Sequence, residues 1–255
     1  MIDIHSHLLP GVDDGSQSVE VSVDVLKRFG ADGVGVVVCT PHLKASRAAA
    51  APYARHREIL DMLRSAAPEP PRLELGWEIM LDQPGVDLTP RQLSLGGSTA
   101  VLVEFPHTGV PARATDELAR IRSRGSVPVL AHPERYWGCT LAHVRDWRFA
   151  GTVIQLDGEA LRTGGRMTRF ALQLLDEGLV DCIASDNHGD VRTLATSRAW
   201  LREIGAEHQA ELLTDINPRR LLASQVLLPV PPLPPSATRI GRRALRRIRQ
   251  LLSLA

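Results

Sequence analysis

Seven short runs rich in valine, isoleucine and leucine recur along this chain of 255 residues, and they constrain its fold more than any other feature. The runs are IDIH from Ile2, VGVVVCTPH from Val34, RLELGWEIML from Arg72, TAVLVEFP from Thr99, VPVLAHPER from Val127, TVIQLDG from Thr152 and VDCIASDNH from Val180. Each run has the length and the β-branched content of a buried strand. The sequence therefore predicts seven strands.

Segments with helical spacing separate most of these runs, and glycines that would stop a helix follow several of them. The expected helices cover residues 18–29, 52–66, 112–124, 141–149, 166–177 and 193–204. Strands that alternate with helices form right-handed βαβ units and a parallel sheet. We therefore predict an α/β fold, a closed seven-stranded β/α barrel of the TIM type, with an open doubly wound sheet as the competing topology.

The composition excludes several classes of protein. A length of 255 residues with 44% hydrophobic content suits one large domain, and a formal net charge of +1 argues against a nucleic-acid-binding surface. The chain has no apolar stretch of about eighteen residues and no N-terminal basic segment ahead of an apolar one, so a cytoplasmic protein is expected. Three widely spaced cysteines, Cys39, Cys139 and Cys182, indicate reduced thiols.

Metal-binding side chains end six of the predicted strands. The chain begins MIDIHSHLLPGVDDGS, and residues two apart on a strand point the same way, so His5 and His7 would direct their imidazoles to one point. The carboxyl ends of parallel strands share one face of a β/α protein. The residues expected to converge there are His5, His7, His42, Glu78, Glu104, His132, Asp186 and His188. Imidazoles and carboxylates without a thiolate suit Mn, Fe, Zn or Ni.

These motifs resemble those of a known superfamily. HSHLLPGVDDGS, CTPH, the Glu of GWEIML, the Glu of VLVEFP, AHPER and ASDNH occur in the order of the PHP (polymerase and histidinol phosphatase) superfamily. Over roughly residues 1–225, the chain resembles the manganese-dependent tyrosine-protein phosphatases of bacterial capsule and exopolysaccharide operons, the CpsB and YwqE type. The resemblance implies a distorted seven-stranded β/α barrel.

The resemblance also implies a catalytic centre of three metal ions, Mn²⁺ with Fe, Zn, Co or Ni as substitutes. Its ligands would be His5, His7, Asp14, His42, Glu78, Glu104, His132, Asp186 and His188, with Glu104 bridging. The sequence pattern alone does not separate Asp13 from Asp14, and only the family pattern selects Asp14. Hydroxide between two metals would attack phosphorus directly, while Arg135 and Arg192 would bind the phosphoryl oxygens.

The implied substrate is phosphotyrosine on a protein, namely a bacterial tyrosine kinase that controls capsule or exopolysaccharide synthesis. Related metal centres also serve phosphatases of small molecules such as histidinol phosphate, and polymerase-associated exonucleases. The near-neutral charge argues against DNA. A non-catalytic metal-dependent binding module is a further alternative, although such a module would not need all nine ligands. Family members can self-associate, so an oligomer is a further expectation.

A cysteine-based mechanism is a rival, because CTLAHVR, from Cys139 to Arg145, matches Cys-x5-Arg. This segment contains no glycine and reads as the start of a helix, whereas a phosphate cradle needs glycines that turn backbone N–H groups inward. We therefore do not expect Cys139 to be a nucleophile.

Several other polar residues invite a functional interpretation. We expect His56, His143 and His208 to be structural or surface residues, because they lie in helical segments. His107 follows a strand and would reach the mouth of the site. Asp3 lies on the same strand face as His5 and is expected to orient its ring.

The carboxyl-terminal part departs from the barrel pattern. We divide the chain into a barrel over residues 1–228, a proline-rich linker, PVPPLPP, over 229–235, and a tail over 236–255. Arginines and leucines alternate in the tail at near-helical spacing, which predicts a basic amphipathic helix. Such a helix would bind an anionic membrane surface, peripherally at the inner membrane, or an acidic partner; packing on the barrel is the alternative.

Overall fold

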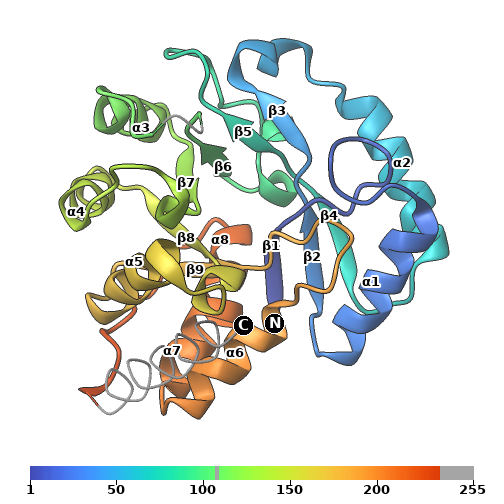
Figure 1. The fold of residues 1–255 in the computed structure, drawn as a ribbon. Coiled ribbons are helices and arrows are strands. Elements are labelled where there is room, and N and C mark those ends of the chain that lie inside the picture. Colours follow the sequence, from blue (N-terminus) through green and yellow to red (C-terminus); the bar gives the residue numbers. More distant parts are fainter. Residues whose placement is uncertain (107–108, 236–255) are drawn as a thin grey trace.

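The computed structural model describes residues 1–106 and 109–235, which form an α/β fold with parallel strands (Figure 1). The strands are β1 (Ile2–Ser6), β2 (Val36–Cys39), β3 (His42–Lys44), β4 (Arg72–Leu75), β5 (Glu78–Met80), β6 (Ala100–Glu104), β7 (Val127–Ala131), β8 (Val153–Asp157) and β9 (Cys182–Ala184). The helices are α1 (Val19–Ala31), α2 (Tyr53–Ala66), α3 (Ala114–Ser123), α4 (Leu141–Phe149), α5 (Gly165–Asp176), α6 (Leu194–Glu203), α7 (Glu207–Glu211) and α8 (Asn217–Leu222).

The prediction of seven strands in one closed barrel is wrong. In the described residues, β1, β2 and β4 form a sheet of three, and β3, β5, β6, β7, β8 and β9 form a sheet of six, with every neighbouring pair parallel. Between β1 and β9, one isolated bridge, Ser6 with Asn187, takes the place of a ladder. The strands therefore surround a common interior without closing the hydrogen-bonded ring.

Two of the predicted runs each break into two strands, which accounts for nine strands in place of seven. Pro41 separates β2 from β3, because proline has no N–H to donate to a ladder. Gly76 and Trp77 lie between β4 and β5, although the Gly76 N–H still donates to the Cys39 carbonyl at 2.9 Å. At both breaks the chain leaves the three-stranded sheet and enters the six-stranded one.

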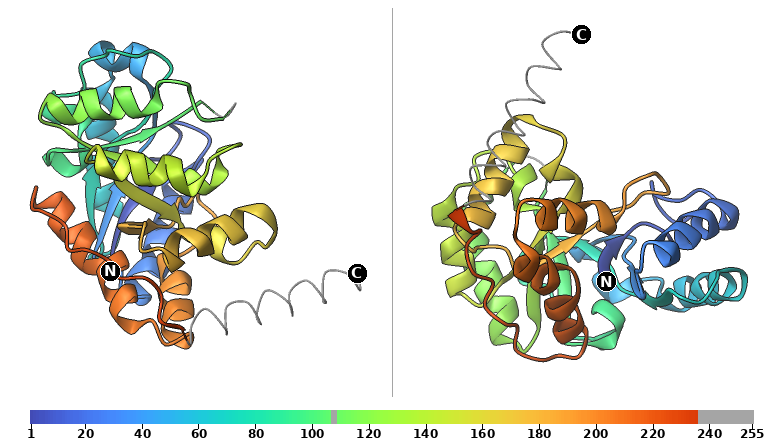
Figure 2. Two further views of the ribbon diagram at one scale, coloured as in Figure 1. Left: turned by 90° about the vertical axis from the view of Figure 1, so that its left-hand side faces the viewer. Right: turned by 90° about the horizontal axis from the view of Figure 1, so that it is seen from below.

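The six predicted helices are present within two residues of their expected ends. Ser18, Thr140 and Thr193 cap three of them, each with its side-chain oxygen accepting a backbone N–H of the first turn. Helices α3, α4 and α5 lie one after another outside the six-stranded sheet, and α1 and α2 cover the three-stranded sheet (Figures 1 and 2). The short helices α7 and α8 were not predicted.

Alternation along the strands places an apolar floor beneath a polar rim. On β6, Leu102 is buried in the interior and Glu104 follows it on the same face. On β8, Val153 occupies the interior, and Gln155 and Asp157 follow it toward the carboxyl end. The outward faces of the same strands pack under the helices. Because every strand runs in the same direction, the polar residues gather at one end of the interior.

The segment after α8 packs back onto the fold. Val230 and Leu233, in the predicted linker, are buried in the main core, and the Gln209 side chain donates a hydrogen bond of 2.8 Å to the Pro232 carbonyl. The predicted tail, residues 236–255, lies outside the described residues, so the division of the chain at 228 and 235 stays a prediction. No helix in the described ranges is both long and apolar enough to cross a membrane.

Replacing Gly76 tests the crossing between the two sheets. A Cβ at this position would lie 2.8 Å from Leu95 Cδ2 and 3.1 Å from Val38 Cγ1, so Gly76→Ala must displace buried side chains. We expect the free energy of unfolding in urea to fall by about 1–3 kcal/mol. Gly35→Ala is the control, since its Cβ would meet nothing closer than the Met1 carbonyl oxygen at 3.9 Å. Equal stability of the two variants would contradict this account.

Candidate metal centre

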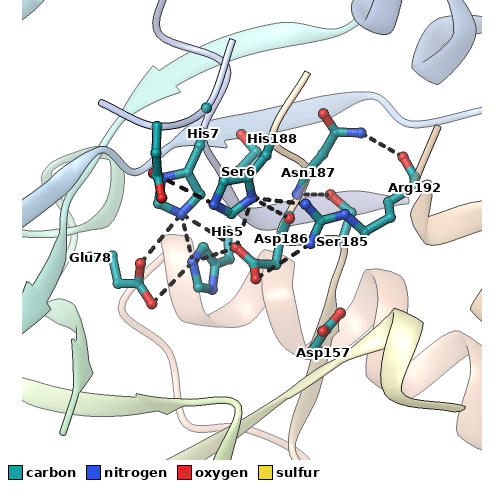
Figure 3. Close-up of polar contacts among 12 residues, drawn as sticks. His5, Ser6, His7, Glu78, Asp157, Ser185, Asp186, Asn187, His188 and Arg192 are labelled. Carbon is teal, nitrogen blue, oxygen red and sulfur yellow. Dashed lines mark hydrogen bonds and ion pairs between the residues drawn. The ribbon is translucent and has the colours of Figure 1, made fainter. Parts of the chain in front are cut away.

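The structure brings all nine predicted ligands to one end of the strand interior. They form four overlapping groups, in each of which one nitrogen or oxygen atom per residue lies within 4.8 Å of the others. The groups are His5, Glu78 and His132; His5, His7 and Asp186; His42, Glu78 and Glu104; and His7, Asp14, His42 and His188. Most of these residues stand at or just beyond strand ends, as predicted, and Figure 3 shows part of the cluster.

Glu78 is the carboxylate that faces the most histidines of the cluster. Its Oε1 lies 2.8 Å from His132 Nε2 and 3.4 Å from His5 Nε2. Its Oε2 lies 3.0 Å from His42 Nδ1 and 3.3 Å from His7 Nε2. Glu104 belongs to a single group and lies 3.9 Å from His42. The geometry therefore places Glu78 among four histidines, and the bridging role that the family pattern assigns to Glu104 stays a prediction.

Two neighbouring hydrogen bonds orient the first two histidines. Because the Asp13 carboxylate only accepts, His7 Nδ1 donates to it at 2.8 Å. His5 Nδ1 lies 3.0 Å from Gln155 Oε1, whose amide nitrogen donates to the Leu156 carbonyl and so fixes the oxygen toward His5. In the neutral form that binds a cation, both rings would therefore carry their lone pair on Nε2, and these two atoms face one another at 3.3 Å.

A cation between these atoms would satisfy both lone pairs, and the surrounding charges also favour one. Burial by itself would lower the pKa of His5, but Glu78 and Asp186 outweigh it and raise that pKa to about 9. Burial and the charge of Glu78 raise the pKa of Glu104 to about 7. The donor set of imidazoles and carboxylates thus fits divalent transition ions. His132 Nδ1 is a buried atom without a partner in the structure, although its Nε2 faces Glu78.

The structure separates the roles of the two aspartates that the sequence left open. Asp14 extends into solvent, and its Oδ1 lies 3.3 Å from His42 Nε2 and 3.7 Å from His188 Nε2. Asp13 instead bonds His7 and accepts the backbone N–H of His42. Asp14 therefore faces the cluster, whereas Asp13 holds the ring of a ligand candidate.

The prediction that Asp3 orients the His5 ring is wrong. Its Oδ1 accepts the backbone N–H groups of His5 and Ser185, so it ties β1 to β9. The ring is oriented by Gln155, which the sequence analysis passed over. The sequence did contain a signal for this role, because Gln155 is a polar residue in the middle of the apolar run TVIQLDG.

The two predicted arginines lie at the edge of the cluster. Arg135 Nη2 lies 2.6 Å from Asp157 Oδ2 and also bonds Asp186. Asp157 ends β8 and is another residue that sequence reasoning missed, although its strand-end position matches that of the chosen ligands. Arg192 Nη2 lies 3.0 Å from His188 Nδ1, and its Nε bonds Asp190 at 2.7 Å.

Two residues of the cluster have left-handed backbone conformations without being glycine. The φ angles are 36° at His132 and 47° at Asp186, directly after β7 and shortly after β9. Such conformations cost about 1–3 kcal/mol and persist only where surrounding contacts impose them. Here they turn a side chain at the strand end into the cluster.

Asn187 organises the loop that carries Arg192, and sequence reasoning did not single it out. Its amide nitrogen lies 2.7 Å from the Arg192 carbonyl and 3.2 Å from the Asp190 carbonyl, and its oxygen accepts the Gly189 N–H. The Asn187 carbonyl also accepts the His7 N–H at 2.7 Å. Through its side chain and its backbone carbonyl together, this fully buried residue therefore links the end of β1 to the arginine loop (Figure 3).

The remaining candidates lie away from the cluster. His56 is buried against Trp77, His143 stacks on Trp147, and His208 lies on α7. His107 lies outside the described residues. Cys139 precedes α4, and burial raises the pKa of its thiol to about 12, so the thiolate that a cysteine mechanism needs is scarce near neutral pH.

Replacing Asn187 tests this loop. Asn187→Asp loses the amide donors and sets a carboxylate against two carbonyls, so we expect hydrogen exchange in residues 188–192 to rise at least about tenfold. Hydrogen–deuterium exchange followed by mass spectrometry measures the exchange of peptides that cover residues 188–192. Asn217→Asp is the matched control, because Asn217 is equally buried and donates to two backbone carbonyls elsewhere. Unchanged exchange in 188–192 would refute the role of Asn187.

Comparison with known proteins gives one consistent result. The family model for capsular polysaccharide synthesis, CpsB/CapC, matches residues 1–223. Tyrosine-protein phosphatase YwqE of Bacillus subtilis is 31% identical over 250 residues, which cover 92% of this chain and 96% of that protein. Tyrosine-protein phosphatase CpsB of Streptococcus pneumoniae is 29% identical over 249 residues, 89% of this chain and all of that one.

Solved structures agree. A crystal structure from work on YwqE and CpsB, described as unique metal-dependent tyrosine phosphatases, superposes with a TM-score of 0.77 at 27% identity, covering 92% of this chain and 99% of that one. A phosphotriesterase from Mycobacterium tuberculosis shares the fold, with a TM-score of 0.55 at 12% identity over 82% of this chain and 86% of that one. The family predicted from the sequence motifs is confirmed: the chain belongs to the CpsB/CapC family of capsular polysaccharide synthesis.

Proposed function

We propose that this protein is a metal-dependent tyrosine-protein phosphatase of capsule or exopolysaccharide synthesis. The observation that carries the proposal is the set of nine histidine, aspartate and glutamate side chains at one rim, with two arginines at its edge. The names of YwqE and CpsB support the same activity. A cysteine nucleophile has no place in this proposal.

The nine residues would hold divalent cations, with Glu78 shared between positions and Mn²⁺ as the proposed ion. Bound cations would lower the pKa of a water ligand toward neutrality and offset the negative charge of a phosphoryl group. Gln155 and Asp13 keep the Nε2 lone pairs of His5 and His7 directed at the centre. The ligand geometry is thus imposed by hydrogen bonds beyond the ligands themselves.

The arginines supply the phosphate-binding function in this proposal. A guanidinium group can bond two phosphoryl oxygens at once. Arg135 is held by Asp157 and Asp186, and Arg192 by Asp190, so both are oriented before substrate arrives. The side of the cluster at Asp14 and His42 is open to solvent, and it offers a phosphotyrosine side chain access from a protein segment. The proposed partner is a tyrosine kinase of the same biosynthetic system.

Glu78→Gln tests the shared ligand position. The amide removes the negative charge that four histidines face, so we expect less bound metal per chain and a fall in kcat/KM of about 100-fold or more. Elemental analysis after Mn²⁺ loading measures the first, and hydrolysis of p-nitrophenyl phosphate measures the second. Glu58→Gln on the exposed face of α2 is the control. Full metal content with full activity would refute the assignment.

A substrate panel tests the function as a whole. We expect Mn²⁺-dependent turnover of a phosphotyrosine peptide, with kcat/KM at least about tenfold above that for histidinol phosphate, and none for single-stranded DNA. A chelator should abolish turnover, whereas Cys139→Ser should retain it. Preference for histidinol phosphate would establish a small-molecule phosphatase instead, and metal binding without any turnover would establish a binding module.

A further inference from the structure

A cavity opens between the segment after β7 and helix α5. It has a volume of about 420 Å³, and its lining includes Trp137, Arg166, Arg169 and Gln173. The Trp137 side chain is 73% exposed, which is unusual for the largest apolar side chain: Trp77 and Trp147 are fully buried, and Trp200 is partly buried against the core. An exposed tryptophan in a cavity is a common feature of binding surfaces.

The cavity carries positive charge without acidic partners. Arg166 donates to the backbone carbonyls of Arg135 and Tyr136, at 3.2 and 3.3 Å, and lies over the Trp137 ring at 5.4 Å. These neutral contacts leave its charge unneutralised. Among the described residues, Arg169 has no carboxylate within ion-pairing distance, and the first turn of α5 contains no acidic residue. An anionic ligand would therefore gain from both guanidinium groups.

The cavity stands at the same rim as the metal centre. Trp137 lies two residues beyond Arg135, and Arg166 bonds the Arg135 carbonyl directly. The cavity is lined by the segment that follows β7 and by α5, which follows β8. Substrates of β/α proteins bind at the carboxyl ends of the strands, from which these segments lead. A peptide whose phosphotyrosine reaches the centre would thus place neighbouring residues along this cavity.

We propose that this cavity binds acidic residues that flank the phosphotyrosine in the substrate protein; the inference rests on the function proposed above. The positive charges of Arg166 and Arg169 favour a ligand segment that carries carboxylates. The chain's own residues 236–255 are unsuited, because they contain six arginines and no acidic residue. Trp137 packs against the apolar parts of the segment, and Arg166 and Arg169 pair with its carboxylates.

Matched peptides test the proposal. One phosphotyrosine peptide carries glutamates on both sides, and the other carries glutamines at the same positions. We expect kcat/KM to be about fivefold higher for the acidic peptide at low salt, and this ratio to shrink at 0.5 M NaCl because surface charges are screened. Arg169→Gln should reduce the ratio to below about twofold. Arg57→Gln, an exposed arginine on α2 outside the cavity, is the control and should keep it.

A binding measurement separates this inference from the catalytic proposal. The exposed Trp137 should change its fluorescence when the unphosphorylated acidic peptide binds, and Trp137→Phe should remove that change. Equal kcat/KM for both peptides in the wild type, or an unchanged ratio in Arg169→Gln, would overturn the subsite while leaving the phosphatase intact. Absence of any phosphotyrosine turnover would instead overturn the proposed function, and the fluorescence titration would still decide whether the cavity binds acidic peptides.

Discussion

The contacts of one buried carboxylate, Glu78, hold the candidate centre together. Its two oxygens lie within 3.4 Å of four imidazoles that come from β1, β3 and β7 and their ends. A carboxylate with an exposed fraction of 2% needs such partners, because an unpaired buried charge costs several kcal/mol. The strands that surround the interior are thus joined at their carboxyl ends by polar contacts as well as by apolar packing beneath.

Support for this cluster comes from residues that would not themselves bind a cation. Gln155 and Asp13 fix two rings, Asp157 holds Arg135, and Asn187 fixes the loop of Arg192. Each of these four side chains is held in place by surrounding residues, and it in turn fixes the orientation of a ligand candidate or of an arginine. This arrangement explains how side chains from distant parts of the chain share one small volume.

Much of the fold could be predicted from the sequence, but its closure could not. Apolar runs and helical spacing gave the helix positions and the parallel α/β class, because both depend on local periodicity. The break at Pro41 had a local signal, namely a missing donor, and was overlooked. At the break beside Gly76, Leu95 and Val38 leave no room for a Cβ, and such crowding appears only after the chain has folded.

For the site, the strand-end pattern by itself predicted eight of the nine side chains, since residues at the ends of parallel strands share one rim, and only the family pattern added Asp14. Their family followed from the order of those motifs. Only the tertiary structure decided that Glu78 is central, that Asp14 and not Asp13 faces the cluster, and that Gln155 in place of Asp3 orients His5. The physical reason is that strand period and direction are local properties, whereas the partner of each buried polar atom depends on which distant segment lies within hydrogen-bond distance.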